Sequence, residues 1–229
     1  MFEFSQAFKE RYGGCFVGGI EVEFETPPSF TQALEKEISR RETAVSERYA
    51  SSSRARLKAL PVISEYVSHF KRFKKSYHVL LQLASAAEGK PVGRFSPLVS
   101  IMLATELSNF VLSSGHDLDR VGLPFTFDIG DSRRAIDLLG DRSQTLKDGD
   151  ITLRDEFGET TLAAVVYGQS RHGMITEQTT HALYVAYGVP GVDGVTIEAY
   201  LGDVAEMLAL CDGSPRVGSP QVVEVAAAR

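Results

Sequence analysis

The sequence predicts an α/β protein of the α+β kind, in which a mixed or antiparallel sheet is packed by helices. Apolar residues recur at helical spacing between residues 29 and 114, and the spacing changes to every second residue after Gly115. A final amphipathic segment follows these strands. Because helical and strand patterns occupy separate stretches, we expect helices gathered against a sheet rather than a regular alternation of the two.

The first predicted strand is CFVGGIEVEFET, residues 15–26, which alternates apolar and polar residues around a Gly-Gly pair. Paired glycines inside a strand indicate a bulge or a close backbone approach. Pro27 and Pro28 end the strand, and Ser29 or Thr31 is placed to cap a helix that runs to about Ala50. Its inner positions, one helical turn apart, are Leu34, Ile38, Arg41 and Val45.

Three more helices are predicted before the strands. One begins at Pro61 and carries Ile63, Val67, Phe70 and Phe73 at helical steps. The next is HVLLQLASAAEGK, which ends at Gly89. The last runs from about Pro97 to Ser114, with Glu106 and Asn109 outside its apolar stripe.

Four strand-length segments follow: LPFTFDI, DITLRD, TTLAAVVYG and HALYVAYG. The DEFG turn between the second and third favours a hairpin with Gly158 in the left-handed region. Gly-Val-Pro-Gly-Val then opens a helix whose expected inner residues begin with Val195 and Tyr200. Residues 213–229 are rich in Gly, Pro, Ser and Ala, and we expect a flexible tail there.

The bulk properties exclude several classes of protein. No apolar run approaches the roughly 20 residues of a membrane span, and the N-terminus lacks the features of a secretory signal, so we expect a cytoplasmic protein. Cys15 and Cys211 lack the spacing of a zinc or redox motif. Loop motifs for nucleotide hydrolysis, zinc proteolysis and α/β-hydrolase chemistry are missing, so we expect no metal and no cofactor.

One segment departs from the net charge of −6. The segment from Arg54 to Lys75 contains seven Lys or Arg residues and one acid, Glu65, which leaves a local excess of six positive charges. The stretch HFKRFKK mixes Phe70 and Phe73 with cations, as RNA-binding surfaces do. The helical spacing also allows both rings to be buried, with the cations on the wet face.

The ordered set from Ser96 to Gly188 resembles the B3/B4 domain of the phenylalanyl-tRNA synthetase beta subunit. The matching pieces are Asp117-Leu118-Asp119 after a helix, the Val165-Val166-Tyr167-Gly168 turn, and Thr179-Thr180 before LYVAYG. The resemblance implies a free-standing B3/B4-like domain over residues 1–212, with a strand and helices in 1–95 and the helix and sheet part in 96–212. No catalytic machinery of a full synthetase is present.

The resemblance also implies a function: binding the acceptor end of tRNA, with hydrolysis of mischarged aminoacyl-tRNA in trans. This chain departs from the family at three positions. His116 or Ser114 stands at the family histidine, Val185 stands where a Glu holds the polar tip of the substrate, and Gln169 replaces a Gly. The alternatives are a non-catalytic tRNA-binding module and a protein that binds an amino acid or small metabolite. The oligomeric state is undetermined by the sequence.

Candidate site residues follow from the polar positions in this segment. For an aminoacyl-tRNA deacylase, the catalytic candidates are His116, Thr179 and Thr180, and the substrate-binding candidates are Asp117, Gly168, Gln169 and His181. The candidate RNA contacts are Lys71, Arg72, Lys74, Lys75 and Arg171. Each has a structural reading too: His116 bonds the end of its helix, His181 opens a strand, Asp117 and Asp119 make Asx turns, and Arg171 lies in a solvated loop.

Overall fold

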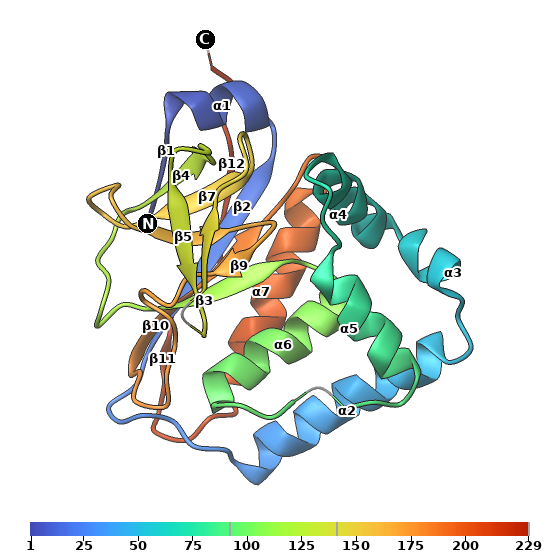
Figure 1. Cartoon of the computed structure of the whole chain (residues 1–229). Coiled ribbons are helices and arrows are strands. Elements are labelled where there is room, and N and C mark those ends of the chain that lie inside the picture. Colours follow the sequence, from blue (N-terminus) through green and yellow to red (C-terminus); the bar gives the residue numbers. More distant parts are fainter. Residues whose placement is uncertain (92, 141, 229) are drawn as a thin grey trace.

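The computed structural model describes residues 1–91, 93–140 and 142–228, and it has the α+β architecture expected from the sequence. Two sheets lie on one side of the molecule and most of the helices lie on the other (Figure 1). Helix α6 (Pro97–Asn109) contacts α2 (Gln32–Tyr49), α5 (His78–Ala87), α7 (Gly194–Leu208) and strand β3 (Ser113–Asp117). It therefore links the helical layer to the sheets.

The predicted helices begin where the sequence signals place them. Thr31 caps α2, since its Oγ1 accepts a hydrogen bond of 3.0 Å from the Leu34 N–H. Pro61 occupies the first turn of α4 (Pro61–Arg72), where its missing N–H costs no helical hydrogen bond. The short helices α1 (Gln6–Tyr12) and α3 (Arg54–Lys58) were not anticipated.

The first sheet has the strand order β1-β4-β7-β8-β9. It is mixed, because β1 pairs with β4 in parallel and the other neighbours are antiparallel. Gly158 forms the β7–β8 turn with φ +67°, as the DEFG sequence predicts. The strands are β1 (Phe2–Phe4), β4 (Phe125–Ile129), β7 (Ile151–Arg154), β8 (Thr161–Ala164) and β9 (Gly168–Gln169).

The second sheet is antiparallel, with the order β11-β2-β10-β3 and β12 also paired to β2. Strand β2 (Phe16–Glu23) packs against α7, and Gly18 lies at this contact. A Cβ atom on Gly18 would come within 2.7 Å of Leu201 Cδ1 and 2.8 Å of Ile197 Cγ2. The glycine pair in β2 thus marks a close approach, as expected from the sequence.

The C-terminal residues differ from the expected flexible tail. Strands β11 (Arg216–Val217) and β12 (Gln221–Glu224) both pair with β2, so this segment completes the second sheet. The prediction from composition was wrong because backbone pairing to an open sheet edge does not depend on apolar periodicity. Val195 was also misplaced, since it is 73% exposed rather than on the inner side of α7.

The end of α6 is a second difference. The helix ends at Asn109 instead of continuing to Ser114, and Phe110 takes the left-handed conformation with φ +62°. Residues 113–117 then form β3, which pairs with β10 (His181–Tyr187). His116 therefore lies in a strand and does not bond a helix end. Glu106, expected outside the apolar stripe, is only 2% exposed.

A small hairpin of β5 (Ala135–Leu138) and β6 (Arg142–Thr145) was absent from the sequence prediction. Its residues Ile136 and Leu138 pack with Leu146 and Ala164 in a small cluster of their own. Across the described ranges, no helix combines the length and the apolar character that crossing a membrane requires.

Candidate functional site

A pocket of about 500 Å³ opens where the start of α6, the β5–β6 hairpin, β9 and the loop after it meet. Most of its wall is apolar, and a few polar groups converge on it, which is the usual character of a small-molecule site. We refer to it as the outer pocket. Its lining residues include Val99, Met102, Leu103, Leu138, Met174 and Ile175 among the apolar ones and Arg142, Tyr167, Gln169 and Thr176 among the polar ones.

Two large apolar side chains stand exposed among the residues that line this pocket. Phe95 is 58% exposed just before α6, and Leu139 is 53% exposed at the β5–β6 turn. Exposed apolar side chains that line one apolar hollow are a feature of ligand-binding grooves. They extend the apolar wall outward.

Gln169 is a polar group of the outer pocket that a hydrogen bond holds in place. Its Nε2 donates a hydrogen bond to the Gly115 carbonyl oxygen of β3, so the amide bridges the two sheets. An amide has a second N–H and an acceptor oxygen beyond that bond, and these can serve a ligand. Gly168 precedes it with φ +98°, a conformation that favours glycine.

A smaller hollow of about 140 Å³ adjoins the outer pocket on the side of α5, and we call it the inner chamber. The two share Met102, Leu103 and Gln169 as lining residues, so they are neighbours across these side chains. The inner chamber lies between α5, α6 and the sheets. Its polar lining residues are His78, Gln82, Glu106, Ser113, Ser114, Gln169 and Tyr187.

Glu106 is the acid of the inner chamber. Its Oε1 accepts hydrogen bonds from the Ser113 N–H at 2.7 Å and the Ser113 hydroxyl at 2.9 Å. Burial nevertheless raises the pKa of this carboxyl to about 7, because removal from water penalises the charged form more than the two bonds favour it. Glu106 therefore changes charge near neutral pH.

Ser114 and His116 lie on the same face of β3 and form a hydrogen-bonded group with Tyr187. The Ser114 Oγ is 2.7 Å from His116 Nε2 and 2.5 Å from the Tyr187 hydroxyl. Burial lowers the pKa of His116 to about 3, so the imidazole is neutral, and its ring packs edge-on against Phe125 at 5.2 Å. His116 is fully buried and lines neither the outer pocket nor the inner chamber.

The other catalytic candidates gather at the far end of the β3–β10 pairing. Thr179 Oγ1 donates to Asp117 Oδ2 at 2.7 Å, and Thr180 Oγ1 donates to Asp119 Oδ2 at 3.0 Å. Asp117 Oδ1 also accepts from the Asp119 N–H at 3.0 Å, which is an Asx turn. His181 Nε2 lies 2.6 Å from Glu21 Oε1. Neither chamber includes these side chains, so the structure separates them from Gly168 and Gln169.

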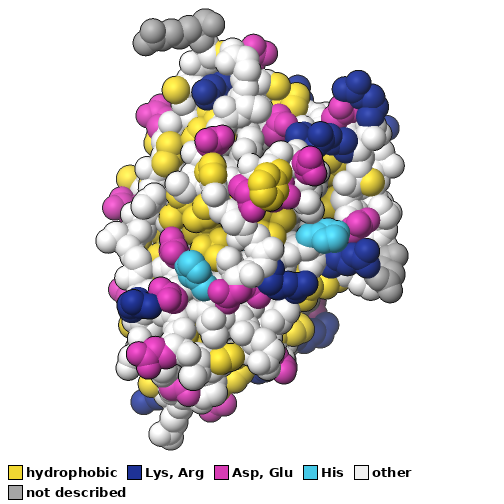
Figure 2. Space-filling model, turned by 90° about the vertical axis from the view of Figure 1, so that its left-hand side faces the viewer, with side chains coloured by type: hydrophobic (Ala, Val, Ile, Leu, Met, Phe, Trp, Pro, Cys, Tyr) yellow, Lys and Arg dark blue, Asp and Glu magenta, His cyan; other side chains and the backbone are white. Residues whose placement is uncertain are grey.

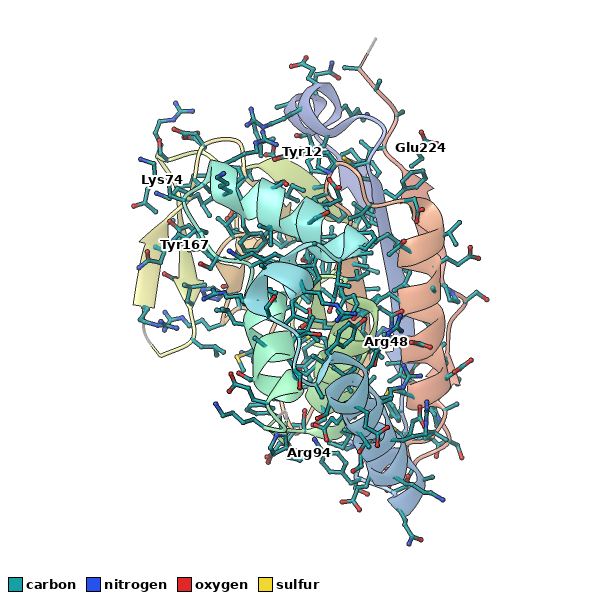
Figure 3. The ribbon with its side chains drawn as sticks, turned by 90° about the vertical axis from the view of Figure 1, so that its right-hand side faces the viewer. Tyr12, Arg48, Lys74, Arg94, Tyr167 and Glu224 are labelled. Atoms are coloured by element: carbon teal, nitrogen blue, oxygen red, sulfur yellow. The ribbon has the colours of Figure 1, made fainter. Side chains whose placement is uncertain are left out.

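The basic segment lies at the end of α4. Phe70 is buried and Phe73 is partly buried, while Lys71, Arg72 and Lys74 are exposed, in line with the alternative that the rings face the core. Lys75 reaches back over the Tyr167 ring, with its Nζ 4.5 Å from the ring centroid. Figure 3 shows Lys74 and Tyr167 on the same side of the molecule.

Two further cations line hollows that Tyr167 also lines, and sequence reasoning missed both. Arg142 lines the outer pocket together with Tyr167, and Lys147 lines a neighbouring surface hollow of about 530 Å³ that Tyr167 also borders. We call Lys75, Arg142 and Lys147 the cationic rim. The acid in that hollow, Asp148, accepts bonds from the Ser132 N–H and hydroxyl at 2.6 and 3.1 Å. The sequence pattern indicated Lys75 alone, because the three members of the rim come from separate segments.

Arg171 lies outside the rim, with its Nη2 3.9 Å from Asp137 Oδ2. His172 Nε2 is 3.3 Å from the same carboxylate oxygen. On the face shown in Figure 2, Asp and Glu side chains are spread widely, whereas most Lys and Arg side chains lie toward its right-hand edge. Within residues 1–91, 93–140 and 142–228, no cluster of His, Cys, Asp and Glu side chains has the arrangement of a metal site.

Comparison with solved structures finds similar chains, and one of them is described here. The chain is similar to an N-terminal fragment of the phenylalanyl-tRNA synthetase beta subunit from Pyrococcus horikoshii, with a TM-score of 0.46 and 15% sequence identity. The match covers 53% of this chain and 42% of that chain, so this chain spans less than half of the fragment's length. No protein-family model and no curated protein sequence matches the chain.

Proposed function

We propose that this protein binds the aminoacylated 3′ end of a tRNA, with the amino-acid side chain in the outer pocket and the RNA against the cationic rim. The observation that carries the proposal is that Tyr167 belongs to both parts. It lines the apolar pocket, and Lys75 covers its ring at 4.5 Å. An apolar pocket and a cationic, aromatic surface thus meet at one residue.

The dimensions of the outer pocket support this ligand. Its volume of about 500 Å³ lies within the range of small-molecule sites and exceeds what one amino-acid side chain fills. The remaining space and the open mouth leave room for the ribose that carries the ester. The apolar lining would take an apolar or aromatic side chain.

The charge distribution supports local contact with RNA. A net charge of −6 opposes binding over the whole surface, because affinity for phosphates comes mainly from the cations that neutralise them. The cations proposed for this contact are the rim residues Lys75, Arg142 and Lys147, together with the exposed Lys71, Arg72 and Lys74, which are close to Lys75 in sequence. A terminal base can stack on an aromatic ring flanked by such cations.

We extend the proposal to hydrolysis of mischarged aminoacyl-tRNA supplied in trans. Ester hydrolysis requires a positioned water and donors for the oxyanion, and it does not require a protein nucleophile. We assign the donor role to the second N–H of Gln169, because the bond from the same amide to Gly115 orients the group at the outer pocket. His116 is unsuited to act as base, since burial holds its pKa near 3.

The test has a binding arm and a reaction arm. Filter retention of aminoacylated tRNA should weaken when Lys75, Arg142 and Lys147 are all changed to Ala. The control is Lys36→Ala at an exposed position on α2, which should leave the retention unaltered. Incubation with a panel of mischarged tRNAs should release the amino acid from at least one faster than buffer does. If the triple variant retains tRNA as well as the wild type does, the proposed RNA-binding surface is wrong. If no mischarged tRNA in the panel is deacylated, the proposed hydrolysis is wrong.

The second candidate function is binding of a free amino acid or a related metabolite without RNA. The inner chamber favours it, because its polar lining could hold a small ligand that never contacts the rim. Thermal stabilisation by an amino acid, together with no retention of any tRNA, would select this function over the first.

A further inference from the structure

The inner chamber is lined by a buried carboxyl, Glu106, that bonds only to Ser113 among the described groups, and by a buried amide oxygen, Gln82 Oε1, that has no hydrogen-bond partner there. Glu106 is 2% exposed, and no Lys, Arg or charged His of the described chain forms an ion pair with it. The Gln82 Oε1 atom is buried and accepts no hydrogen bond from any described group. Buried acceptors are normally satisfied, and the exceptions require an explanation such as an absent ligand.

The neighbouring groups do not remove this deficit. His78 also lines the chamber, but burial lowers its pKa to about 4, so it is neutral at pH 7. Tyr66, Tyr77, Tyr187 and Tyr200 lie close enough to Glu106 for its charge to raise their pKa further, although burial is the main cause of each shift. Glu106 is thus surrounded by phenols and carries no counter-charge.

We propose that the inner chamber binds a protonated primary amine of the ligand, with Glu106 as its counter-ion and Gln82 Oε1 as a second acceptor. An ammonium group has three donors and one positive charge, which suits a hollow lined by a carboxylate without a cationic partner and by an amide oxygen without a donor, among the described groups. A chamber of about 140 Å³ has room for a group of this size. Because Met102, Leu103 and Gln169 line both hollows, the rest of the ligand would extend into the outer pocket.

This inference rests on the proposed function for the identity of the ligand, the α-amino group of an aminoacyl ester. A free polyamine offers the same ammonium chemistry, so the test includes one. The ionisation of Glu106 gives a second readout. A carboxyl with a pKa of about 7 is partly protonated at neutral pH, and an incoming ammonium would displace that proton into the buffer.

The experiment is calorimetric titration of the full chain at pH 7, in two buffers of different ionisation enthalpy, with small probes and no tRNA. The probes are L-phenylalaninol, its N-acetyl derivative and spermidine. L-Phenylalaninol should bind with proton release, and acetylation should weaken binding by roughly tenfold or more, since it removes the partner of a buried charge. Tight binding of spermidine instead would assign the site to a free polyamine.

Variants separate the chamber from a general loss of structure. Glu106→Gln should bind L-phenylalaninol and its acetyl derivative equally and release no proton, and its thermal melt shows whether it folds. Gln82→Met leaves Glu106 in place and should reduce the preference for the amine by a smaller factor. Glu198→Gln, at an exposed position on α7, is the matched control and should behave as the wild type.

Equal binding of the amine and acetyl probes by the wild type, or no binding of any probe, would overturn the inference. These outcomes are independent of the tRNA arm described above. If the protein prefers the amine probe but does not retain tRNA, only the proposed RNA function is wrong. If it retains tRNA but does not prefer the amine probe, only the ammonium site is wrong.

Discussion

The Lys75 ammonium nitrogen lies 4.5 Å from the centroid of the Tyr167 ring. This contact joins the turn after α4 to the turn between β8 and β9, which are 92 residues apart in the sequence. Lys74, directly before Lys75, takes a left-handed conformation with φ +57°, which changes the chain direction at the end of the helix. The contact places a cation beside an aromatic ring at the mouth of an apolar pocket, the arrangement that single-stranded nucleic acids favour.

Lys75→Ala is expected to weaken tRNA retention by about threefold to tenfold and to reduce the slope of log affinity against log salt by about 1, the loss of one phosphate contact. Tyr167→Leu removes the ring but no charge, so it should weaken retention without changing that slope. Filter binding across a salt series measures both quantities. An unchanged slope in Lys75→Ala would show that this cation does not meet a phosphate.

Glu106 should make the free energy of unfolding depend on pH. Its pKa is about 7 in the folded protein against an ordinary 4.5, so the folded state binds more protons between these values and stability falls as pH rises through that window. The penalty is absent below pH ~4.5 and complete above pH ~7, with a size on the order of 3 kcal/mol.

Glu106→Gln removes this ionisation and keeps an acceptor for Ser113. The variant should therefore gain stability relative to the wild type as pH rises from 5 to 8, by about 2 to 3 kcal/mol, as measured by urea unfolding. Glu198→Gln is the control, and at an exposed position it should change stability by less than about 0.5 kcal/mol. If the difference in unfolding free energy between the wild type and Glu106→Gln does not change with pH, the raised pKa of Glu106 is contradicted.

Gly18→Ala should destabilise the protein by about 1 to 3 kcal/mol, because the added Cβ would overlap Leu201, Ile197 and the Gln221 carbonyl. The last of these is backbone of β12, which cannot rotate away. Gly202→Ala on α7 is the opposite case, since a Cβ there meets nothing within 4 Å. It should stabilise by up to about 1 kcal/mol through helix propensity, and thermal melts of both variants give the comparison.

The elements that the sequence predicted correctly are those with a strong local signal. Thr31 and Pro61 start their helices, Gly158 turns its hairpin, and the Gly18-Gly19 pair marks a close contact. The elements that were missed depend on distant partners. Strand β12 is formed by pairing with the edge of β2, and the β5–β6 hairpin packs against Ala164. Neither element has a periodic apolar pattern from which it could be predicted.

The site shows the same division. Gly168 and Gln169, which the sequence predicted as substrate-binding residues, line the inner chamber, and Gln169 also lines the outer pocket; their role in binding stays a prediction. Glu106 was set aside because it falls outside the apolar stripe of its helix. It is buried all the same, since α6 is covered by other elements on several sides, and a helix in that position has no wet face to which a polar residue can be assigned.

Arg41 provides the last prediction, which concerns the helical layer behind the inner chamber. Its guanidinium donates to Glu37 Oε1 at 2.8 Å and to Asp203 Oδ2 at 2.6 Å, and the same Asp203 oxygen accepts from Asn109 Nδ2 at 2.7 Å. These bonds tie α2, α6 and α7 together. Burial alone would raise the pKa of Asp203, and the bonds from Arg41 and Asn109 hold it below its ordinary value.

Arg41→Ala should destabilise the protein by about 2 to 4 kcal/mol, because it leaves Asp203 without its counter-charge in a partly buried site. Arg40→Ala, whose side chain is 64% exposed and bonds only to Glu37 among the described groups, should cost less than about 1 kcal/mol. The depressed pKa of Asp203 adds a pH signature: the stabilisation is present above the unfolded pKa and is lost as pH falls through the folded one. The difference between wild type and Arg41→Ala should therefore shrink in acid, and urea unfolding that shows it growing instead would contradict the ion pair.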